Sequence, residues 1–400
     1  MVLKWVTFLV VFLYVFPINN GSRELYMYSI TREEELELEK EVQSLNKPPV
    51  KTFQLEEGDI IDCIDINKQP ALDHPLLKNH KIQMRPTSYP TGFGSDMESS
   101  EAATEKKHLK YECPLGTVPI PRTTKEGLLK SKALSKQFIN DMHNDHLVLV
   151  ILKERPDYKY HGVMGKMSIH NITVGEDQSS STNIWVGNGP PDQVNYIAAG
   201  LMMSPMTNGD SLPRMFTYWT GDGAQRTGCF NMDCKGFVQV HKIFAPKYLF
   251  PPPYAVYGGQ MIDHNFQLLQ DKETKNWWLV LELKTPVGYF PKELFPYLSE
   301  GAGVVEWGAV AKTGKNGISP PMGNGYKPNR VFDQSSYFRR IRFVDGNFDG
   351  QRPSKHDTEN YEDPSGCYKL INDKDYGGQL FSYYFLYGGP GGQCGNNSVS

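Results

Sequence analysis

From residue 146 onward, the chain alternates short apolar and aromatic runs with Gly, Pro and Asn turns. The first run, 147–152, is uniformly apolar and predicts a buried strand. Runs of similar length follow at 183–186, 214–219, 236–240, 276–281, 337–344 and 381–387. Helical periodicity is nearly absent there, apart from one short helix expected over 291–298. The pattern predicts a mainly β fold, a large antiparallel sandwich or barrel spanning 145–400.

The segment before residue 145 is more polar and predicts a small, separate N-terminal domain. A capping-box pattern at 31–34 opens a Glu-rich amphipathic stretch that predicts one helix ending near Leu45. A short strand is expected around Cys63. Residues 88–107 resemble a polar linker. A basic stretch at 122–136 leads to 140–145, which we expect to be an exposed site for proteolytic nicking.

The first residues predict a secretion signal over 1–22. Lys4 supplies the charged start, and an apolar run follows over 5–16 before polar residues resume. This run is too short for a comfortable membrane span, although an uncleaved anchor is the alternative. We therefore expect a secreted protein on a cell-wall or vacuolar route, without a stable membrane span after cleavage. The expected domains are 1–22, the small N-terminal domain with its linker over 23–144, and the sandwich 145–400.

The chain has six cysteines, an even number that fits three disulfides in a secreted protein. Local spacing favours Cys229–Cys234 and Cys367–Cys394, which leaves Cys63–Cys113. No CxxC pair or histidine at ligand spacing supports zinc, so no metal is expected. Sequons at Asn171 and Asn396 predict N-glycosylation; that at Asn20 lies at the expected cleavage site.

Charge and motifs exclude several classes of function. The net charge is −3 without a basic block, so nucleic acid is not an expected partner. No GxSxG motif supports a Ser–His–Asp triad, and paired cysteines leave no thiol nucleophile. The glycine-rich stretch 388–395 lacks the Lys and helix of a phosphate-binding loop. No cofactor is therefore expected.

One carboxylate stands out in the strand-like stretch 303–308, Gly-Val-Val-Glu-Trp-Gly. Alternation places Val304 and Glu306 on one face of the strand, with Val305 and Trp307 on the other. In one interpretation Glu306 faces solvent on an edge strand. In the other it is a carboxyl group in a sheet cleft, with a pKa suited to acid–base chemistry.

Motifs along most of the chain, from about residue 56 to 394, resemble the plant neprosin family. The stretch 58–84 resembles its activation peptide. Stretches that resemble its C-terminal domain are Tyr218-Trp-Thr, Cys234-Lys-Gly-Phe-Val-Gln, Asn276-Trp-Trp, Gly288-Tyr-Phe-Pro, Val305-Glu-Trp-Gly, Met322-Gly-Asn-Gly and Tyr387-Gly-Gly-Pro-Gly. The resemblance implies a secreted glutamic endopeptidase that cleaves after proline, is made as a zymogen and uses two glutamates on a β-sandwich.

The resemblance assigns only one of those glutamates here. The family's Val-Glu-Trp-Gly motif maps to Glu306, whereas its Ile-Glu-Ala-Gly-Trp motif maps to 197–201, where Ala198 replaces the glutamate and Leu201 the tryptophan. A carboxyl pair works because one group is ionised while the other holds a proton, which alanine cannot do.

We therefore expect an impaired or inactive neprosin-like protein, a pseudoenzyme that still binds proline-containing peptides or proline-rich wall proteins. Two alternatives stay open. The first is an active endopeptidase in which Glu306 works with another partner, for which Glu282 and Asp192 are the candidate carboxylates. The second is a cell-wall binding module.

Overall fold

The computed structural model describes residues 31–91, 110–140 and 145–394, apart from 154, 156, 355 and 374–377. The chain separates into two compact units, 1–39 and 40–400. In the first unit, helix α2 (Arg32–Leu45) begins with the expected capping box. The Thr31 backbone N–H donates to Glu34 Oε2 at 2.8 Å, and the Glu34 N–H donates to Thr31 Oγ1 at 3.2 Å. The predicted signal over 1–22 lies outside the described residues, as does most of the 88–107 linker.

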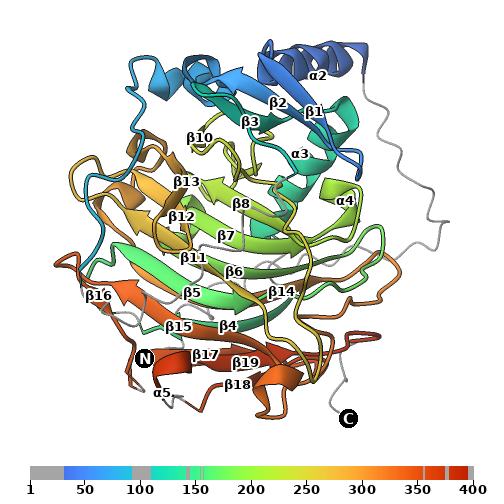
Figure 1. The fold of residues 1–400 in the computed structure, drawn as a ribbon, viewed down its shortest axis with the longest axis vertical. Helices are drawn as coiled ribbons and strands as arrows, with labels where there is room; N and C mark the ends of the chain where they lie inside the picture. The colour runs from blue at the N-terminus through green and yellow to red at the C-terminus, as the bar shows by residue number, and fades with distance from the viewer. Residues whose placement is uncertain are drawn as a thin grey trace, which may run out of the picture. The chain divides into compact units, whose positions relative to one another are not determined.

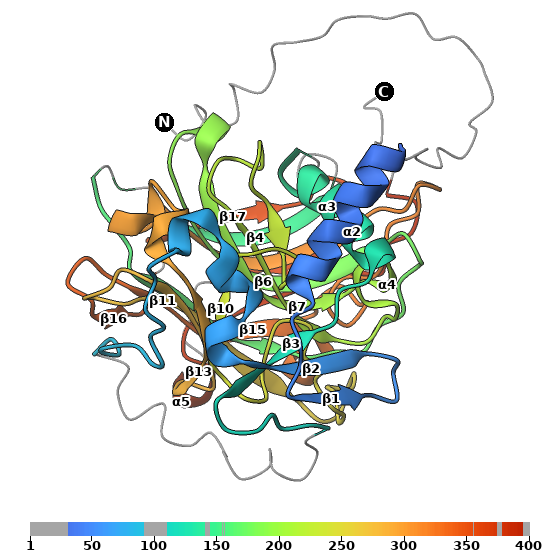
Figure 2. The ribbon, with the colours of Figure 1, turned by 90° about the horizontal axis from the view of Figure 1, so that it is seen from above.

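The N-terminal part of the second unit contains a small antiparallel sheet. Its strands are β1 (Lys51–Gln54), β2 (Ile60–Asp65) and β3 (Thr117–Pro121), which lie side by side in Figure 2. Strand β2 confirms the strand expected around Cys63. The short 3₁₀ helices are η2 (Ile66–Lys68), η3 (Pro70–Asp73) and η4 (Pro75–Leu77).

Helix α3 (Lys125–Asn140) spans most of the basic stretch 122–136, where the sequence analysis predicted no helix. Leu128 and Leu134 are buried while Lys132 is exposed, so the basic residues cover the outer side of an amphipathic helix. The missed signal is the three-residue spacing of Leu128, Ser131 and Leu134, two apolar residues and one small residue, all of which are buried. Residues 141–144, within the expected nicking site, lie outside the described residues.

Two large sheets form the rest of the described chain (Figure 1). The seven-stranded sheet has the order β17-β4-β14-β6-β7-β8-β9. Its strands are β17 (Thr358–Glu362), β4 (His146–Leu152), β14 (Val304–Lys312), β6 (Ser179–Asn188), β7 (Asn195–Met203), β8 (Arg214–Thr220) and β9 (Cys229–Phe230). Every strand pair in it is antiparallel.

The nine-stranded sheet has the order β10-β13-β12-β11-β5-β15-β19-β18, with β16 beside β15. Its strands are β10 (Val238–Gln239), β13 (Thr285–Phe290), β12 (Trp277–Leu281), β11 (Asp263–Gln270), β5 (Gly162–Ser168), β15 (Ser336–Val344), β19 (Phe385–Gly388), β18 (Lys369–Ile371) and β16 (Gly350–Gln351). The remaining helices are α4 (Pro205–Asn208), α5 (Gly378–Phe381), η7 (Pro191–Gln193), η8 (Lys292–Leu294), η9 (Leu298–Glu300) and η10 (Phe332–Gln334). The helix expected over 291–298 is thus two short 3₁₀ turns.

The core lies between the two large sheets and confirms the predicted antiparallel sandwich. Val305 and Trp307 of β14 are fully buried in this core, together with residues of β5, β11 and β15. The Trp307 indole N–H donates to the Met164 carbonyl of the facing sheet at 2.8 Å. Because alternate residues of a strand face opposite ways, Glu306 points away from this core.

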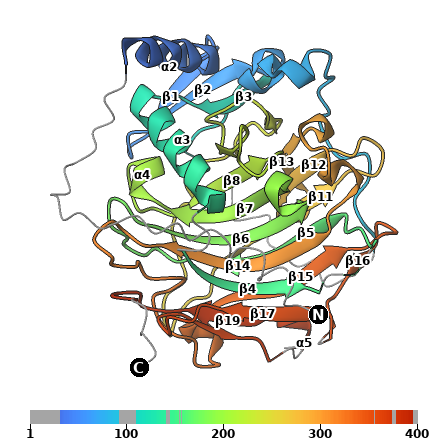
Figure 3. The ribbon, with the colours of Figure 1, turned by 180° about the vertical axis from the view of Figure 1, so that it is seen from behind.

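Segments from the N-terminal part cover the outer face of each sheet. Leu134 of α3 packs against the outer face of the seven-stranded sheet, and Figure 3 shows α3 beside β7 and β8. Ala71 of η3 and the partly buried Ile82 pack against the outer face of the nine-stranded sheet. The two coverings come from one continuous part of the sequence, so this segment contacts both layers of the sandwich.

Three disulfides join all six cysteines in the pairs favoured by spacing: Cys63–Cys113, Cys229–Cys234 and Cys367–Cys394. Asn171 is exposed in the connection between β5 and β6, whereas Asn396 lies outside the described residues. Glycosylation stays a prediction. None of the helices in the described ranges is long and apolar enough to cross a membrane.

Candidate carboxyl site

A single row of directly paired residues crosses the seven-stranded sheet through Glu306. In this row, each residue is paired with the next across adjacent antiparallel strands, and the members are Ile151, Glu306, Trp185, Ala198, Tyr218 and Phe230. Directly opposed residues of antiparallel strands project from the same face. The row therefore places Glu306 and position 198 on one face, the face opposite the core.

Glu306 lies in the interior of the sheet, which contradicts the edge-strand interpretation. Strand β14 is paired with β4 on one side and with β6 on the other. The residue keeps partial exposure, and the Tyr196 hydroxyl donates a hydrogen bond to its Oε2 at 2.9 Å. Burial raises the pKa of Glu306 above its ordinary value, and the hydrogen bond from Tyr196 offsets part of this increase.

Ala198 stands two strands away from Glu306, with Trp185 of β6 between them. Two successive antiparallel pairs separate the Cα atoms by roughly 10 Å. Long side chains at both positions could meet above the central strand, but the Ala198 side chain ends at Cβ and is completely buried. The face thus has a carboxyl at one of the two positions that the sequence analysis singled out.

Neither proposed substitute carboxylate stands beside Ala198. Asp192 is exposed on η7, outside the row. Glu282 follows β12 of the other sheet, where its Oε1 lies 2.7 Å from His264 Nδ1 and accepts from the Asn265 N–H. The partner that contacts Glu306 is Tyr196, which sequence analysis missed because nothing in the local pattern predicts a hydrogen bond between residues 110 apart.

Helix α3 covers this face. Leu134 belongs to the same apolar cluster as Trp185, Tyr196 and Ala198. The Tyr218 hydroxyl donates to the Ser135 carbonyl at 3.4 Å. Burial raises the pKa of Tyr218, so the phenol stays protonated and acts as a donor. A peptide could approach the buried part of the row only where α3 leaves space or moves away.

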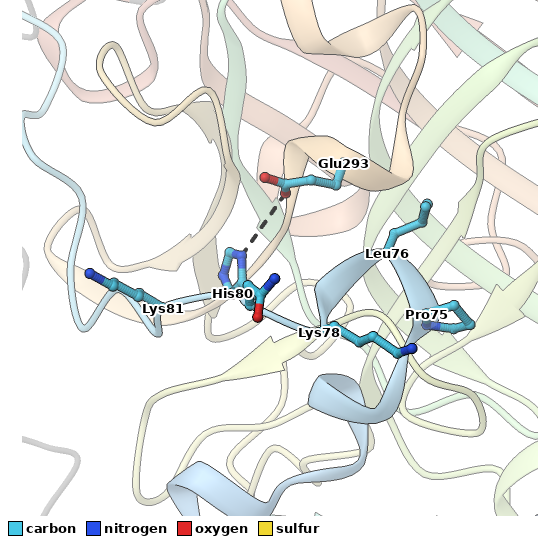
Figure 4. Close-up of a pocket in the computed structure, with 7 residues that line it drawn as sticks. Pro75, Leu76, Lys78, His80, Lys81 and Glu293 are labelled. Carbon is cyan, nitrogen blue, oxygen red and sulfur yellow. Dashed lines mark ion pairs between the residues drawn. The ribbon is translucent and has the colours of Figure 1, made fainter.

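A cavity of about 500 Å³ lies elsewhere, at the contact between 75–81 and η8 (Figure 4). His80 Nε2 lies 2.7 Å from the Tyr289 hydroxyl, and His80 Nδ1 lies 4.0 Å from Glu293 Oε2. Burial lowers the pKa of His80, and Glu293 opposes that shift. This cavity shares no lining residue with the Glu306 row, so we assign it to docking of the N-terminal segment.

A Ser–His–Asp constellation is present although no sequence motif predicted it. His146 Nε2 lies 2.9 Å from Ser319 Oγ, and His146 Nδ1 lies 2.9 Å from Asp363 Oδ1. Ser319 is 2% exposed, and the two following residues are prolines, which have no N–H to stabilise an oxyanion. The geometry therefore supports a structural role, in which His146 anchors the start of β4.

The described ranges contain no group of three or more His, Cys, Asp or Glu side chains arranged to hold a metal ion. The chemistry that the site offers comes instead from one partly exposed carboxyl with a raised pKa, one phenol and one indole.

Fold and site together define a two-sheet β protein in which an N-terminal segment covers a carboxyl-bearing face. Residues 176–390, more than half of the chain, match the family model Neprosin, and residues 52–162 match the Neprosin activation peptide. The chain belongs to the neprosin family and carries that family's activation peptide ahead of its C-terminal domain.

Two solved structures are similar over 61% of this chain and 97% of their own. One is scytalido-glutamic peptidase with a peptide-based transition state analog, at 11% identity and a TM-score of 0.35. The other is SCP-B, a member of the eqolisin family of peptidases, in complex with the tripeptide Ala-Ile-His, at 9% identity and a TM-score of 0.30. Similarity at this level assigns neither residues nor activity.

Proposed function

We propose that this protein is a secreted, glycosylated member of the neprosin family whose proline-directed glutamic endopeptidase activity is impaired. Ala198 takes the place of the second catalytic glutamate. The activation segment corresponds to 23–144 and the peptidase-like domain to 145–400. The observation that carries the proposal is the row in which Glu306 and Ala198 share one face, two strands apart.

The expected loss follows from acid–base chemistry. Amide hydrolysis by a carboxyl pair needs one group to take a proton from water and another to donate a proton or polarise the carbonyl. Glu306 can fill one of these roles at a time. Removing a general acid or base costs a factor of about 10² to 10⁴, and a member of a coupled pair can cost nearly the whole effect.

We expect the protein to retain peptide binding although its catalysis is impaired. The face around Glu306 carries the aromatic residues Trp185, Tyr196 and Tyr218. Tyr and Trp rings stack on proline rings, and proline-rich segments bind aromatic surfaces at a low entropic cost. We therefore propose proline-containing peptides, including proline-rich wall proteins, as ligands of this face.

The test is cleavage of a proline-containing peptide at acidic pH by the processed protein and by Ala198→Glu processed in the same way. The natural protein is expected to turn over at least 10²-fold more slowly than Ala198→Glu. Ala198→Gln, which adds similar bulk without an ionisable group, is the matched control and should stay slow. Turnover by the natural protein at an ordinary enzymatic rate, about 1 s⁻¹ or more, would refute the proposed impairment.

A further inference from the structure

Tyr196 reaches Glu306 by crossing over strand β6. It lies on β7 and is paired with Gly187 of β6, while Glu306 on the far side of β6 is paired with Trp185. Its hydroxyl nevertheless donates to Glu306 Oε2 at 2.9 Å. Tyr196 thus spans the same central strand that a long carboxylate side chain at position 198 would have to span.

Gly187 makes this crossing possible. A Cβ atom at position 187 would lie 2.9 Å from Tyr196 Cδ2 and 3.3 Å from Tyr196 Cε2. Contacts below 3.0 Å do not occur at a real Cβ, so any other residue there would displace the ring. The sequence therefore combines a tyrosine at 196 with a glycine at 187, and together they place a phenol on the carboxyl.

Trp185 supplies a second donor on the same face. Its side chain is 1% exposed, and its indole N–H has no hydrogen-bond partner among the described residues. A buried donor without an acceptor costs about 1–3 kcal/mol, and an acceptor supplied by a ligand on this face would remove that cost. Trp185 stands between Glu306 and Ala198, where a substrate carbonyl would have to lie.

We propose that Tyr196 is the second catalytic residue of the Glu306 site, where its hydroxyl donates to the substrate carbonyl in place of the missing carboxyl. The substrate class that suits this pair is acyl esters with good leaving groups, with amides as poor substrates. The inference rests on the proposed function, because it uses the same face and the same carboxyl.

The reaction balances with one carboxyl and one phenol. The Glu306 carboxylate takes a proton from water, and the water oxygen bonds to the ester carbonyl carbon. Once Glu306 is protonated, the Tyr196 hydroxyl turns its single O–H from Glu306 to the resulting oxyanion, which also accepts a hydrogen bond from the Trp185 indole N–H. The C–O bond to the leaving group then breaks, and the leaving oxygen receives the proton from Glu306. The products are an acid and an alcohol or phenol, and Glu306 is again a carboxylate.

The phenol explains the preference for esters. Burial, with a further contribution from Glu306, raises the pKa of Tyr196 well above its ordinary value. The phenol therefore donates a hydrogen bond without giving up its proton. An amide nitrogen must be protonated before it can leave, whereas an aryloxide can leave first and receive the proton from Glu306 afterwards. A site with one proton-transferring group thus retains more activity toward an aryl ester than toward an amide.

The test uses an N-acyl-prolyl p-nitrophenyl ester and the matching p-nitroanilide, with the full chain as the catalyst. The rate measured with Glu306→Gln gives the background hydrolysis rate of each substrate. Tyr196→Phe, which keeps the ring but removes the hydroxyl, is expected to lower kcat for the ester by about 10²-fold with little change in KM. Because the hydrogen bond lowers the pKa of Glu306, Tyr196→Phe should also move the acidic limb of the pH–rate profile to higher pH.

Gly187→Ala is the second variant, because it displaces the Tyr196 ring and leaves the hydroxyl in the chain. Introduced into the natural protein, it should reproduce much of the loss in ester kcat. Combined with Tyr196→Phe, it should cause little further loss. An unchanged ester kcat and pH limb in Tyr196→Phe would overturn the inference. Ester turnover by the natural protein no faster than by Glu306→Gln would also overturn the inference. If Ala198→Glu still cleaves peptides in that case, the proposed function stands. An inactive Ala198→Glu with an ester rate that depends on Tyr196 would reject the proposed function alone.

Discussion

The two large sheets each carry a buried or partly buried carboxyl group, and the two groups have opposite surroundings. Asp263 of the nine-stranded sheet accepts from Arg339 Nε at 2.6 Å and from the Tyr337 hydroxyl at 2.8 Å, with Lys166 Nζ at 3.6 Å. Burial alone would raise the pKa of Asp263, but Arg339, with Lys166 and Tyr337, holds it below its ordinary value. Glu306 accepts a hydrogen bond from the Tyr196 phenol, no cation pairs with it among the described residues, and its pKa is raised.

This difference distinguishes a carboxylate that stabilises the fold from one that can exchange a proton. A buried charge that is paired and hydrogen-bonded stabilises its surroundings and has little tendency to exchange a proton. A carboxyl that is desolvated without a cation can gain or lose a proton near the pH at which it works. The three predictions that follow extend or break this contrast.

The largest expected effect is on stability at Asp263. Asp263→Asn removes the anion that pairs with Arg339 and Lys166 in a mostly buried place, which costs about 3–5 kcal/mol. Denaturant unfolding at neutral pH measures the loss. Asp192→Asn, at an exposed site, is the control and should change stability by less than about 0.5 kcal/mol. If Asp263→Asn lost as little stability as Asp192→Asn, the proposed difference between Asp263 and Glu306 would be contradicted.

A smaller effect is expected where α3 covers the Glu306 face. Leu134→Ala removes apolar contacts with the cluster around Trp185 and should weaken packing of α3 by about 2–3 kcal/mol. We expect faster hydrogen exchange in α3 and in β8, whereas the strands around Asp263 stay protected. Ala133→Ser, at an exposed position of the same helix, is the matched control. Equal exchange in Leu134→Ala and Ala133→Ser would show that α3 does not protect this face.

The smallest expected effect depends on pH. The native pKa of Glu306 lies above the unfolded value, so the native state binds the proton more tightly, and stability falls as pH rises from about 4.5 through the native pKa. Glu306→Gln removes this penalty, and each unit of the shift is worth about 1.4 kcal/mol. The variant should therefore gain stability over the natural protein at neutral pH and show no gain below pH 4. A constant difference at all pH values would contradict the raised pKa.

Much of the sandwich could be predicted from the sequence because its strands are continuous apolar runs bounded by turn residues. The alternation around Glu306 correctly placed Val305 and Trp307 on the face opposite Glu306, and in the structure that face lies in the core. Helix α3 was missed because its basic residues obscured a narrow apolar stripe. Position 198 was found only through a motif resemblance, since alanine itself gives no sign of a lost carboxyl.

Side-chain hydrogen bonds between distant parts of the sequence were not predicted. The Tyr196–Glu306 hydrogen bond depends on strand order and on the space above Gly187, neither of which a local pattern contains. The His146, Ser319 and Asp363 cluster likewise forms only through the packing of three separate segments. Both cases show that long-range pairing, more than local propensity, decides which polar residues meet.

The central contrast is tested most directly by titrating both carboxyl groups in the full chain by ¹³C NMR, with Glu306→Gln and Asp263→Asn used to assign the signals. We expect the pKa of Glu306 above its ordinary value of 4.5 and that of Asp263 below its ordinary value of 3.8. A pKa of Glu306 at or below 4.5 would contradict its role as the proton-exchanging group of the site.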